Sequence, residues 1–267
     1  MLRLYVDTAL AAGEALALPA GAARHVQVRR LQPGEPLVLF DGRGGEWRAR
    51  VRQIGRQQVV VGVETHHAVD REARPAVTLA VAMPANERMD WLVEKATELG
   101  AVAVQPLVAA RSVLRLDGER AARKRAHWQA IAVAAAEQCG RTRVPAIHAP
   151  AVFDAWLNEA GPVPNGFVLC LAHDEEAPDG AADAIRAPDA AGAPIAAASA
   201  VSGASVVTVL SGPEGGLSPQ EEQDAVAHGL RRWSLGPRVL RAETAPLAAL
   251  VLLTQATGPH RRDAARP

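Results

Sequence analysis

The sequence predicts an α/β protein in which a parallel β-sheet domain follows a smaller β-rich domain. In the first seventy of the 267 residues, short apolar runs surround a glycine turn, which is typical of a small barrel or sandwich. Beyond Pro75, apolar runs of strand length alternate with segments of helical periodicity, a pattern that favours a parallel sheet. We therefore expect domains at residues 1–72 and 76–258 and a frayed tail at 259–267.

Each expected element has its own signal in the sequence. One helix has an apolar stripe formed by Met89, Leu92, Val93, Ala96 and Leu99, and it ends at Gly100. Between two later strands, residues 178–204 consist mostly of alanine, glycine, proline and serine, so we expect a flexible insert there. The expected strands are 36–40, 46–54, 57–64, 76–83, 102–107, 166–172, 205–210 and 231–235, and the expected helices are 86–99, 118–138, 151–160, one from Pro219, and 244–257.

The composition places the chain among ordinary globular proteins. Hydrophobic residues make up 49% and charged residues 22%, and no apolar run is long enough to cross a membrane. The start of the chain lacks the plan of a signal peptide, so we expect a cytoplasmic protein without a membrane partner. Cys139 and Cys170 stand apart without metal-ligand spacing, and no metal is expected. The net charge is zero, with a slight basic excess in residues 1–72.

Three expected loops follow strands, and in an open parallel sheet ligands bind where strands end. They read "LAHDEE", "SGPEGG" and "SLGPRVLRAET", and together they could form one pocket. The second loop leads into a helix for which Ser218 is a suitable cap, Pro219 a suitable first residue and Glu221 a capping-box partner. The dinucleotide, P-loop, nucleophile-elbow and zinc-protease motifs are all absent from the sequence.

Two carboxy-terminal motifs carry a family resemblance. "LSGPEGGLSPQEE" followed by "SLGPRVLRAETAPLAAL" resembles the paired motifs of the SPOUT superfamily of S-adenosylmethionine-dependent RNA methyltransferases. More narrowly, the chain resembles the ribosomal RNA small-subunit methyltransferase E family. Supporting stretches are Lys95–Gly100 with Gln105 and Pro106, Ala136–Arg141 with Pro145, and, more loosely, 24–35. Two features depart from the family pattern: Val28, Arg29 and Arg30 stand where a Val-Leu-Arg run is common, and the insert at 178–204 is longer than expected.

The resemblance implies a SPOUT-type trefoil-knotted sheet domain preceded by a PUA-like β-barrel that grips RNA. It implies S-adenosylmethionine as cofactor, 16S ribosomal RNA as substrate, and a homodimer. It also implies which residues form the site. The cofactor would be held by Leu171, His173, Ser211, Gly212, Glu214, Gly215, Leu235, Gly236 and Leu240; the catalytic residues would be Arg141, Arg241 and Glu243; and Arg29 and Arg30 would contact RNA.

The implied reaction methylates N3 of a uridine, which first has to lose a proton. An arginine fork could meet the charge that builds on the uracil oxygens, for which Arg30, Arg141 and Arg241 are candidates. The general base remains open among Glu243, Glu137 and His173, although Glu243 could also merely stabilise the start of the last helix.

Other functions also remain open at this level. The chain could methylate another base or a ribose 2′-hydroxyl, because the cofactor loops do not encode the acceptor. It could be a different α/β enzyme that binds an anion at the helix beginning with Pro219. A non-catalytic RNA-binding protein is the third alternative.

Overall fold

The structure is a computed structural model. It describes residues 1–56, 58–85, 87–171 and 206–255. The predicted insert at 178–204, the predicted tail at 259–267 and the candidate residue His173 therefore lie outside the described residues.

The chain divides into two compact units. Residues 1–72 with 130–145 form the amino-terminal unit, and residues 73–129 with 146–267 form the carboxy-terminal unit. The division falls within helix α3 (Gly118–Cys139), so this helix contributes to both units.

The amino-terminal unit is built on a five-stranded sheet. Its strand order is β1-β3-β4-β5-β2, in which β1 and β3 are parallel and the other pairs are antiparallel. Leucine and valine side chains from this sheet and from helix α1 form the core of the unit. The elements are β1 (Leu2–Tyr5), β2 (Ala15–Ala17), α1 (Ala20–Val28), β3 (Pro36–Phe40), β4 (Glu46–Ile54) and β5 (Val59–His67).

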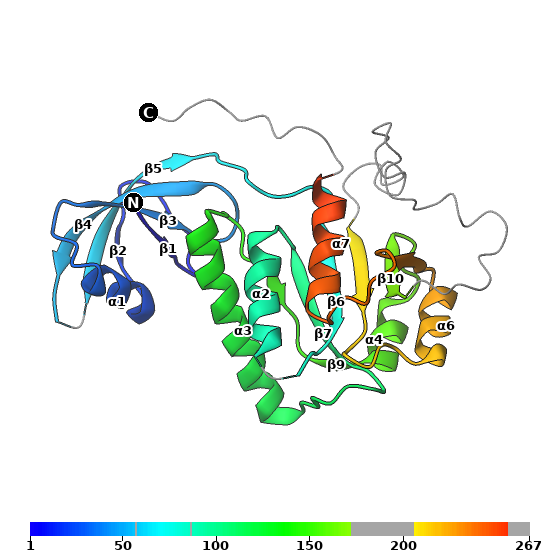
Figure 1. Cartoon of the computed structure of the whole chain (residues 1–267). Helices are drawn as coiled ribbons and strands as arrows, with labels where there is room; N and C mark the ends of the chain where they lie inside the picture. The colour runs from blue at the N-terminus through cyan, green and yellow to red at the C-terminus, as the bar shows by residue number, and fades with distance from the viewer. Residues whose placement is uncertain (57, 86, 172–205, 256–267) are drawn as a thin grey trace. The chain divides into compact units, whose positions relative to one another are not determined.

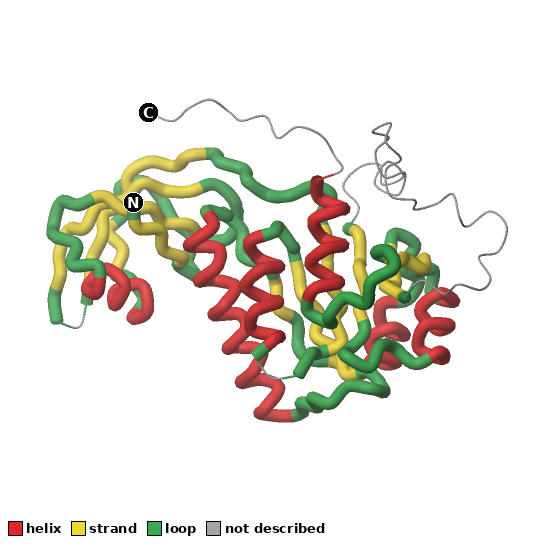
Figure 2. Tube along the Cα trace, viewed as in Figure 1, coloured by secondary structure: helices red, strands yellow, loops and turns green. Residues whose placement is uncertain are grey.

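The carboxy-terminal unit is built on a seven-stranded sheet in which every strand pair is parallel (Figures 1 and 2). The strand order is β12-β10-β11-β6-β7-β8, and β9 also pairs with β7. The strands are β6 (Val77–Ala82), β7 (Ala103–Val108), β8 (Ala146–Ile147), β9 (Ala151–Val152), β10 (Gly166–Cys170), β11 (Val207–Ser211) and β12 (Arg231–Ser234). Among the described residues, the helices that lie wholly in this unit are α2 (Arg88–Glu98), α4 (Phe153–Ala160), α6 (Pro219–Ala227) and α7 (Thr244–Gln255).

Helices cover both faces of the parallel sheet, which explains why its central strands are mostly apolar. Helix α7 contacts α2 and strands β6 and β11, whereas α6 contacts α4 and β10. In Figures 1 and 2 these two pairs of helices lie on opposite sides of the sheet. The predicted stripe of α2 is buried at Met89, Leu92, Val93 and Ala96, but Leu99 is 36% exposed because the helix has already ended there.

This architecture fixes where a ligand can bind. Because β10, β11 and β12 are parallel neighbours, the loops that follow them leave the same edge of the sheet. No helix in the described ranges is both long enough and apolar enough to cross a membrane.

Candidate active site

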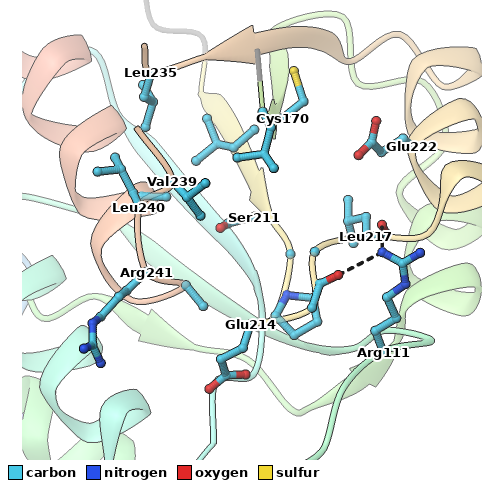
Figure 3. A pocket seen from close by; sticks show the side chains of 18 of the residues that line it. Arg111, Cys170, Ser211, Glu214, Leu217, Glu222, Leu235, Val239, Leu240 and Arg241 are labelled. Atoms are coloured by element: carbon cyan, nitrogen blue, oxygen red, sulfur yellow. Dashed lines mark hydrogen bonds between the residues drawn. The ribbon is translucent and has the colours of Figure 1, made fainter. Parts of the chain in front are cut away.

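A cavity of about 640 Å³ lies where strands β10, β11 and β12 end. This volume is in the range of about 300–1,000 Å³ that is typical of small-molecule sites. The three loops that were predicted to form one pocket all contribute to its lining, the first through Leu171. In Figure 3, Leu235, Val239 and Leu240 approach from one side, and Arg111 and Leu217 from the other.

The loop after β11 is bare because the chain folds back on itself there. A Cβ atom at Gly212 would lie 2.7 Å from the backbone nitrogen of Leu217, closer than real Cβ contacts. The turn is closed by Gly216, whose φ of +68° is in the left-handed region and whose N–H donates to the Pro213 carbonyl at 2.8 Å. A side chain is thus excluded at Gly212, and at this point the backbone of the loop lines the cavity.

The helix that follows this loop begins as predicted. Ser218 caps α6 by accepting from the Glu221 N–H at 3.2 Å, and the Glu221 carboxylate accepts from the Ser218 N–H at 2.8 Å. The buried Glu221 side chain also accepts from the Ala110 N–H at 2.7 Å. The capping box therefore fixes the loop at its far end and joins it to the chain after β7.

Arg111, which also lines the cavity, holds the same loop through hydrogen bonds to its backbone. Its guanidinium Nη1 donates to the Gly215 carbonyl at 2.9 Å and to the Leu217 carbonyl at 3.2 Å. The sequence did not single out Arg111, because its acceptors are backbone groups that lie more than one hundred residues away in the chain.

The loop after β12 supplies the apolar wall of the cavity. Leu235 and Leu240 are half-buried, Val239 is exposed, and Gly236 adopts a φ of +104° that permits the turn between them. Arg241 is exposed and also lines the cavity. Arg238 of the same loop also lines the cavity, so this wall offers an apolar surface beside two cations.

Arg88 lines the cavity and contacts two carboxylates, those of Glu214, which also lines the cavity, and Glu243. Glu214 accepts from the Ala85 N–H at 2.9 Å and from Arg88 Nη1 at 3.3 Å. Arg88 Nε lies 3.8 Å from Glu243 Oε1. Glu243 is 9% exposed, and its Oε2 is buried without a hydrogen-bond partner among the described residues. A buried, unpartnered carboxylate oxygen is costly in a folded protein, so it marks Glu243 as a functional candidate.

The thiol of Cys170 also lines the cavity. Burial raises its pKa, and the negative charge of Glu222 raises it further. The thiol is therefore protonated at neutral pH, and a nucleophilic role is disfavoured.

The structure brings together most of the predicted cofactor residues. The lining includes Leu171, Ser211, Gly212, Glu214, Gly215, Leu235, Gly236, Leu240 and the predicted catalytic residue Arg241. Glu243 reaches this group through Arg88, which the sequence analysis missed.

The other predicted site residues within the described ranges belong to the amino-terminal unit. Arg141 belongs to the amino-terminal unit, where its side chain is 5% exposed and forms an ion pair with Glu72. Arg29 and Arg30 are exposed at the end of α1 in the same unit. Glu137, an alternative base, accepts from the Tyr5 N–H at 2.8 Å. The described residues contain no group of three or more His, Cys, Asp or Glu side chains that could hold a metal ion.

Comparison with known proteins agrees with this geometry. Residues 71–254 match the family model of the RNA methyltransferase domain, and residues 18–64 match the RNA methyltransferase PUA domain. The predicted fold class is thereby confirmed, because the α/β domain matches the first model and the β-rich domain before it matches the second.

Relatives and solved structures extend over nearly the whole chain. The ribosomal RNA small subunit methyltransferase E of Bacillus subtilis is 34% identical, over 89% of this chain and 88% of that protein. The crystal structure of the corresponding enzyme from Neisseria gonorrhoeae, bound to S-adenosylmethionine, is 30% identical, with a TM-score of 0.79 over 96% of this chain and 97% of the other. A Legionella pneumophila protein with bound S-adenosylmethionine is 32% identical, with a TM-score of 0.80 over 96% and 97% of the two chains.

Both of these crystallised proteins contain the cofactor that the sequence predicts. The matched domains, the identity with curated relatives and the agreement in fold lead to one conclusion: the chain belongs to the ribosomal RNA small subunit methyltransferase E family of RNA methyltransferases.

Proposed function

We propose that this protein transfers a methyl group from S-adenosylmethionine to N3 of a uridine in 16S ribosomal RNA of the small ribosomal subunit. The observation that carries the proposal is the cavity at the ends of β10, β11 and β12, which combines a bare glycine loop, an apolar wall and cationic side chains. Family membership and the cofactor bound in two solved neighbours support it.

The residues around the cavity fit S-adenosylmethionine. Leu235 and Leu240 provide the apolar walls that a purine requires, and the loop at Gly212 exposes backbone donors and acceptors. The carboxylate of Glu214 can accept hydrogen bonds from ribose hydroxyls while it is held by Arg88. When bound, the cofactor supplies an electrophilic methyl group on a sulfonium sulfur.

We assign Glu243 as the group that removes the N3 proton. Its unpartnered Oε2 can accept a proton, and Glu243 sits three residues beyond Leu240 in the cavity loop. Of the two alternative bases, Glu137 lies in the amino-terminal unit, where it accepts from a backbone N–H, and His173 lies outside the described residues. Arg88 lies 3.8 Å from Oε1 of the same carboxylate and can hold the side chain in position for this role.

Arg241 is the cation that we assign to the acceptor base. It is exposed and lines the cavity, so its guanidinium can donate to a uracil oxygen as negative charge develops there. Arg141 is less suited to this role, since its guanidinium is buried in an ion pair with Glu72. We therefore propose that Arg141 supports the structure of its unit, and that the exposed Arg29 and Arg30 contact RNA phosphates.

Three further features are part of the proposal. A homodimer is supported by apolar side chains that remain exposed, namely Val239 and, on α7, Val251 and Leu252. A trefoil knot follows from the resemblance to SPOUT enzymes, and the return of the chain from edge strand β12 to place α7 against β6 and β11 is consistent with it. The ribosomal substrate places the protein in the cytoplasm.

The anion-binding alternative at α6 is disfavoured by the capping box. The N–H groups of Ser218 and Glu221 already donate within the capping box, Pro219 has no N–H, and the buried carboxylate of Glu221 would repel a phosphate.

The proposal is tested by methyl transfer to unmodified small ribosomal subunits. Labelled S-adenosylmethionine is supplied, the RNA is digested, and the labelled nucleoside is identified by mass spectrometry. We expect 3-methyluridine. Label in a different base or on a ribose 2′-hydroxyl would refute the acceptor assignment, and cofactor binding without transfer to subunits or free RNA would refute the activity.

A further inference from the structure

Helix α3 carries a row of basic side chains that the proposed reaction does not use. Arg120, Arg123, Lys124 and His127 line a cavity of about 260 Å³ on the surface of the carboxy-terminal unit. Their spacing of three, four and seven residues places them on one face of the helix, in a row about 10 Å long. Among the described residues, the side chains that line this cavity include no carboxylate.

The positive charge of this region is a local feature. The whole chain has equal numbers of basic and acidic residues, whereas residues 111–125 contain six Lys or Arg against two Asp or Glu, a net charge of +4. Basic side chains are therefore concentrated in this segment, in a protein that has no overall attraction for polyanions.

Some of these cations have acidic partners, and others have none in the described part of the chain. Arg123 pairs with Glu119 at 3.3 Å, and His127 contacts Asp90 at 2.7 Å. Arg120 and Lys124 form no ion pair with any described residue. Of the four side chains in the row, these two can therefore bind an anion without first breaking an ion pair. The row thus retains at least two uncompensated positive charges.

The basic row is continuous in sequence with the cofactor cavity. Arg111 lines that cavity, and the loop that contains it leads from β7 directly to the start of α3 (Figure 1). Arg115 lies between them and is exposed. A polyanion whose acceptor nucleotide enters the cofactor cavity can therefore meet further cations along this loop and helix.

We infer that the face of α3 formed by Arg120, Arg123, Lys124 and His127 binds the phosphate backbone of the substrate RNA. The inference rests on the proposed function for the identity of the RNA. It assigns RNA contact to the carboxy-terminal unit itself, in addition to the PUA domain. Since helix side chains in such a row contact phosphates and not base edges, the surface contributes affinity and position without sequence preference.

The test compares RNA binding by the double variant Arg120→Gln/Lys124→Gln with binding by the unchanged protein. The probe is protein-free, unmodified 16S RNA, and binding is measured at several salt concentrations. Each lost phosphate contact lowers the slope of log affinity against log salt by about 0.7 for single strands, so loss of two contacts lowers it by about 1.4 and weakens binding about 25-fold at 0.1 M salt. Glutamine keeps the helix propensity, and S-adenosylmethionine affinity should be unchanged.

Lys95→Gln is the matched control for the single variants Arg120→Gln and Lys124→Gln, because each of the three substitutions removes one positive charge. It also removes one positive charge from a helix of the same unit, but Lys95 is paired with Glu94 and Glu98. We expect the control to bind RNA within about twofold of the unchanged protein. An equal loss in the control, or an unchanged slope in the double variant, would overturn the inference.

The two proposals fail in distinguishable ways. If methyl is transferred to a nucleoside other than uridine but the double variant still binds RNA weakly, the proposed function fails and the surface stands. If 3-methyluridine forms and the double variant binds RNA normally, the surface fails and the function stands. A defect seen only with assembled subunits, and not with protein-free RNA, would mean that the basic row binds an acidic protein and would overturn the assignment to RNA.

Discussion

Replacement of Gly212 by alanine should disrupt the cofactor loop, although the change adds only one methyl group. The added Cβ would lie 2.7 Å from the Leu217 backbone nitrogen and 2.9 Å from the Gly216 carbonyl carbon. Favourable contacts between heavy atoms are at about 3.5–4.0 Å, so the first distance is about 0.8 Å too short. Because both neighbours are backbone atoms, the loop itself has to move.

The size of the effect follows from what overpacking costs in a closely packed site. Such strain is about 1–3 kcal/mol, and each 1.4 kcal/mol corresponds to a tenfold change in an equilibrium constant. If the loop relieves the strain by leaving its binding conformation, S-adenosylmethionine affinity should fall about 5-fold to 150-fold. Titration calorimetry measures this affinity directly, and thermal unfolding without cofactor shows whether the protein remains folded.

Gly215→Ala provides the control within the same loop. A Cβ atom at Gly215 meets only the Arg111 side chain at 3.4 Å, which is ordinary contact, and its φ is not in the left-handed region. We expect nearly unchanged cofactor affinity for this variant. Equal affinities for the two alanine variants would refute the reasoning that close approach of the backbone, and not glycine content, shapes the loop.

Three further predictions concern charged and titratable groups. Arg88→Gln should lower kcat more than it raises the KM for S-adenosylmethionine, because Arg88 contacts both Glu214 and the proposed base Glu243; an unchanged kcat would contradict this positioning role. In a Cys139→Ala background, Cys170 should react with iodoacetamide more slowly than a free thiol at pH 7.5, since burial raises its pKa, and S-adenosylmethionine should protect it. Burial also raises the pKa of Glu137, so the folded state binds more protons and stability falls as pH rises from 4.5 through the raised value. Urea unfolding should show this fall for the unchanged protein and a smaller one for Glu137→Gln; parallel pH curves would contradict it.

The sequence predicted the elements that have strong local signals. Strands β6, β7, β10 and β11 are mostly apolar runs, β12 lies within the predicted run 231–235, and α6 has a complete capping box, so these elements were found within a few residues. Strands β8 and β9 were not predicted, because each is only two residues long, and β9 falls within the stretch 151–160 that was predicted as a helix. Helix α1 was missed because its apolar stripe is limited to Ala22, Ala23 and Val26 and its cap position is Pro19, without a side-chain cap. Strand β1 was missed because its partner, β3, lies more than thirty residues further along the chain.

The place of the cavity was predictable because it depends on local sequence signals, whereas the contacts of its charged side chains were not predictable. Glycines and strand ends are local features, and a parallel sheet brings the strand ends to one edge. The contacts of Arg88 and Arg111 join residues that lie more than one hundred positions apart in the chain. No pattern in the sequence specifies those partners. The sequence around an arginine therefore does not distinguish a solvated side chain from one that holds a loop in place.

Arg141 shows the reverse case, in which a motif position does not specify a role. The Arg141 guanidinium donates from Nε to Glu72 at 3.0 Å, and the two side chains are 5% and 11% exposed. Removing one partner of a buried pair typically costs about 3–5 kcal/mol, because the other charge remains buried. A guanidinium held in this way is not free to follow the charge that develops on a substrate, whereas the exposed Arg241 can do so. Burial, which the motif does not encode, is therefore our reason for assigning a structural role to Arg141 and the role in the reaction to Arg241.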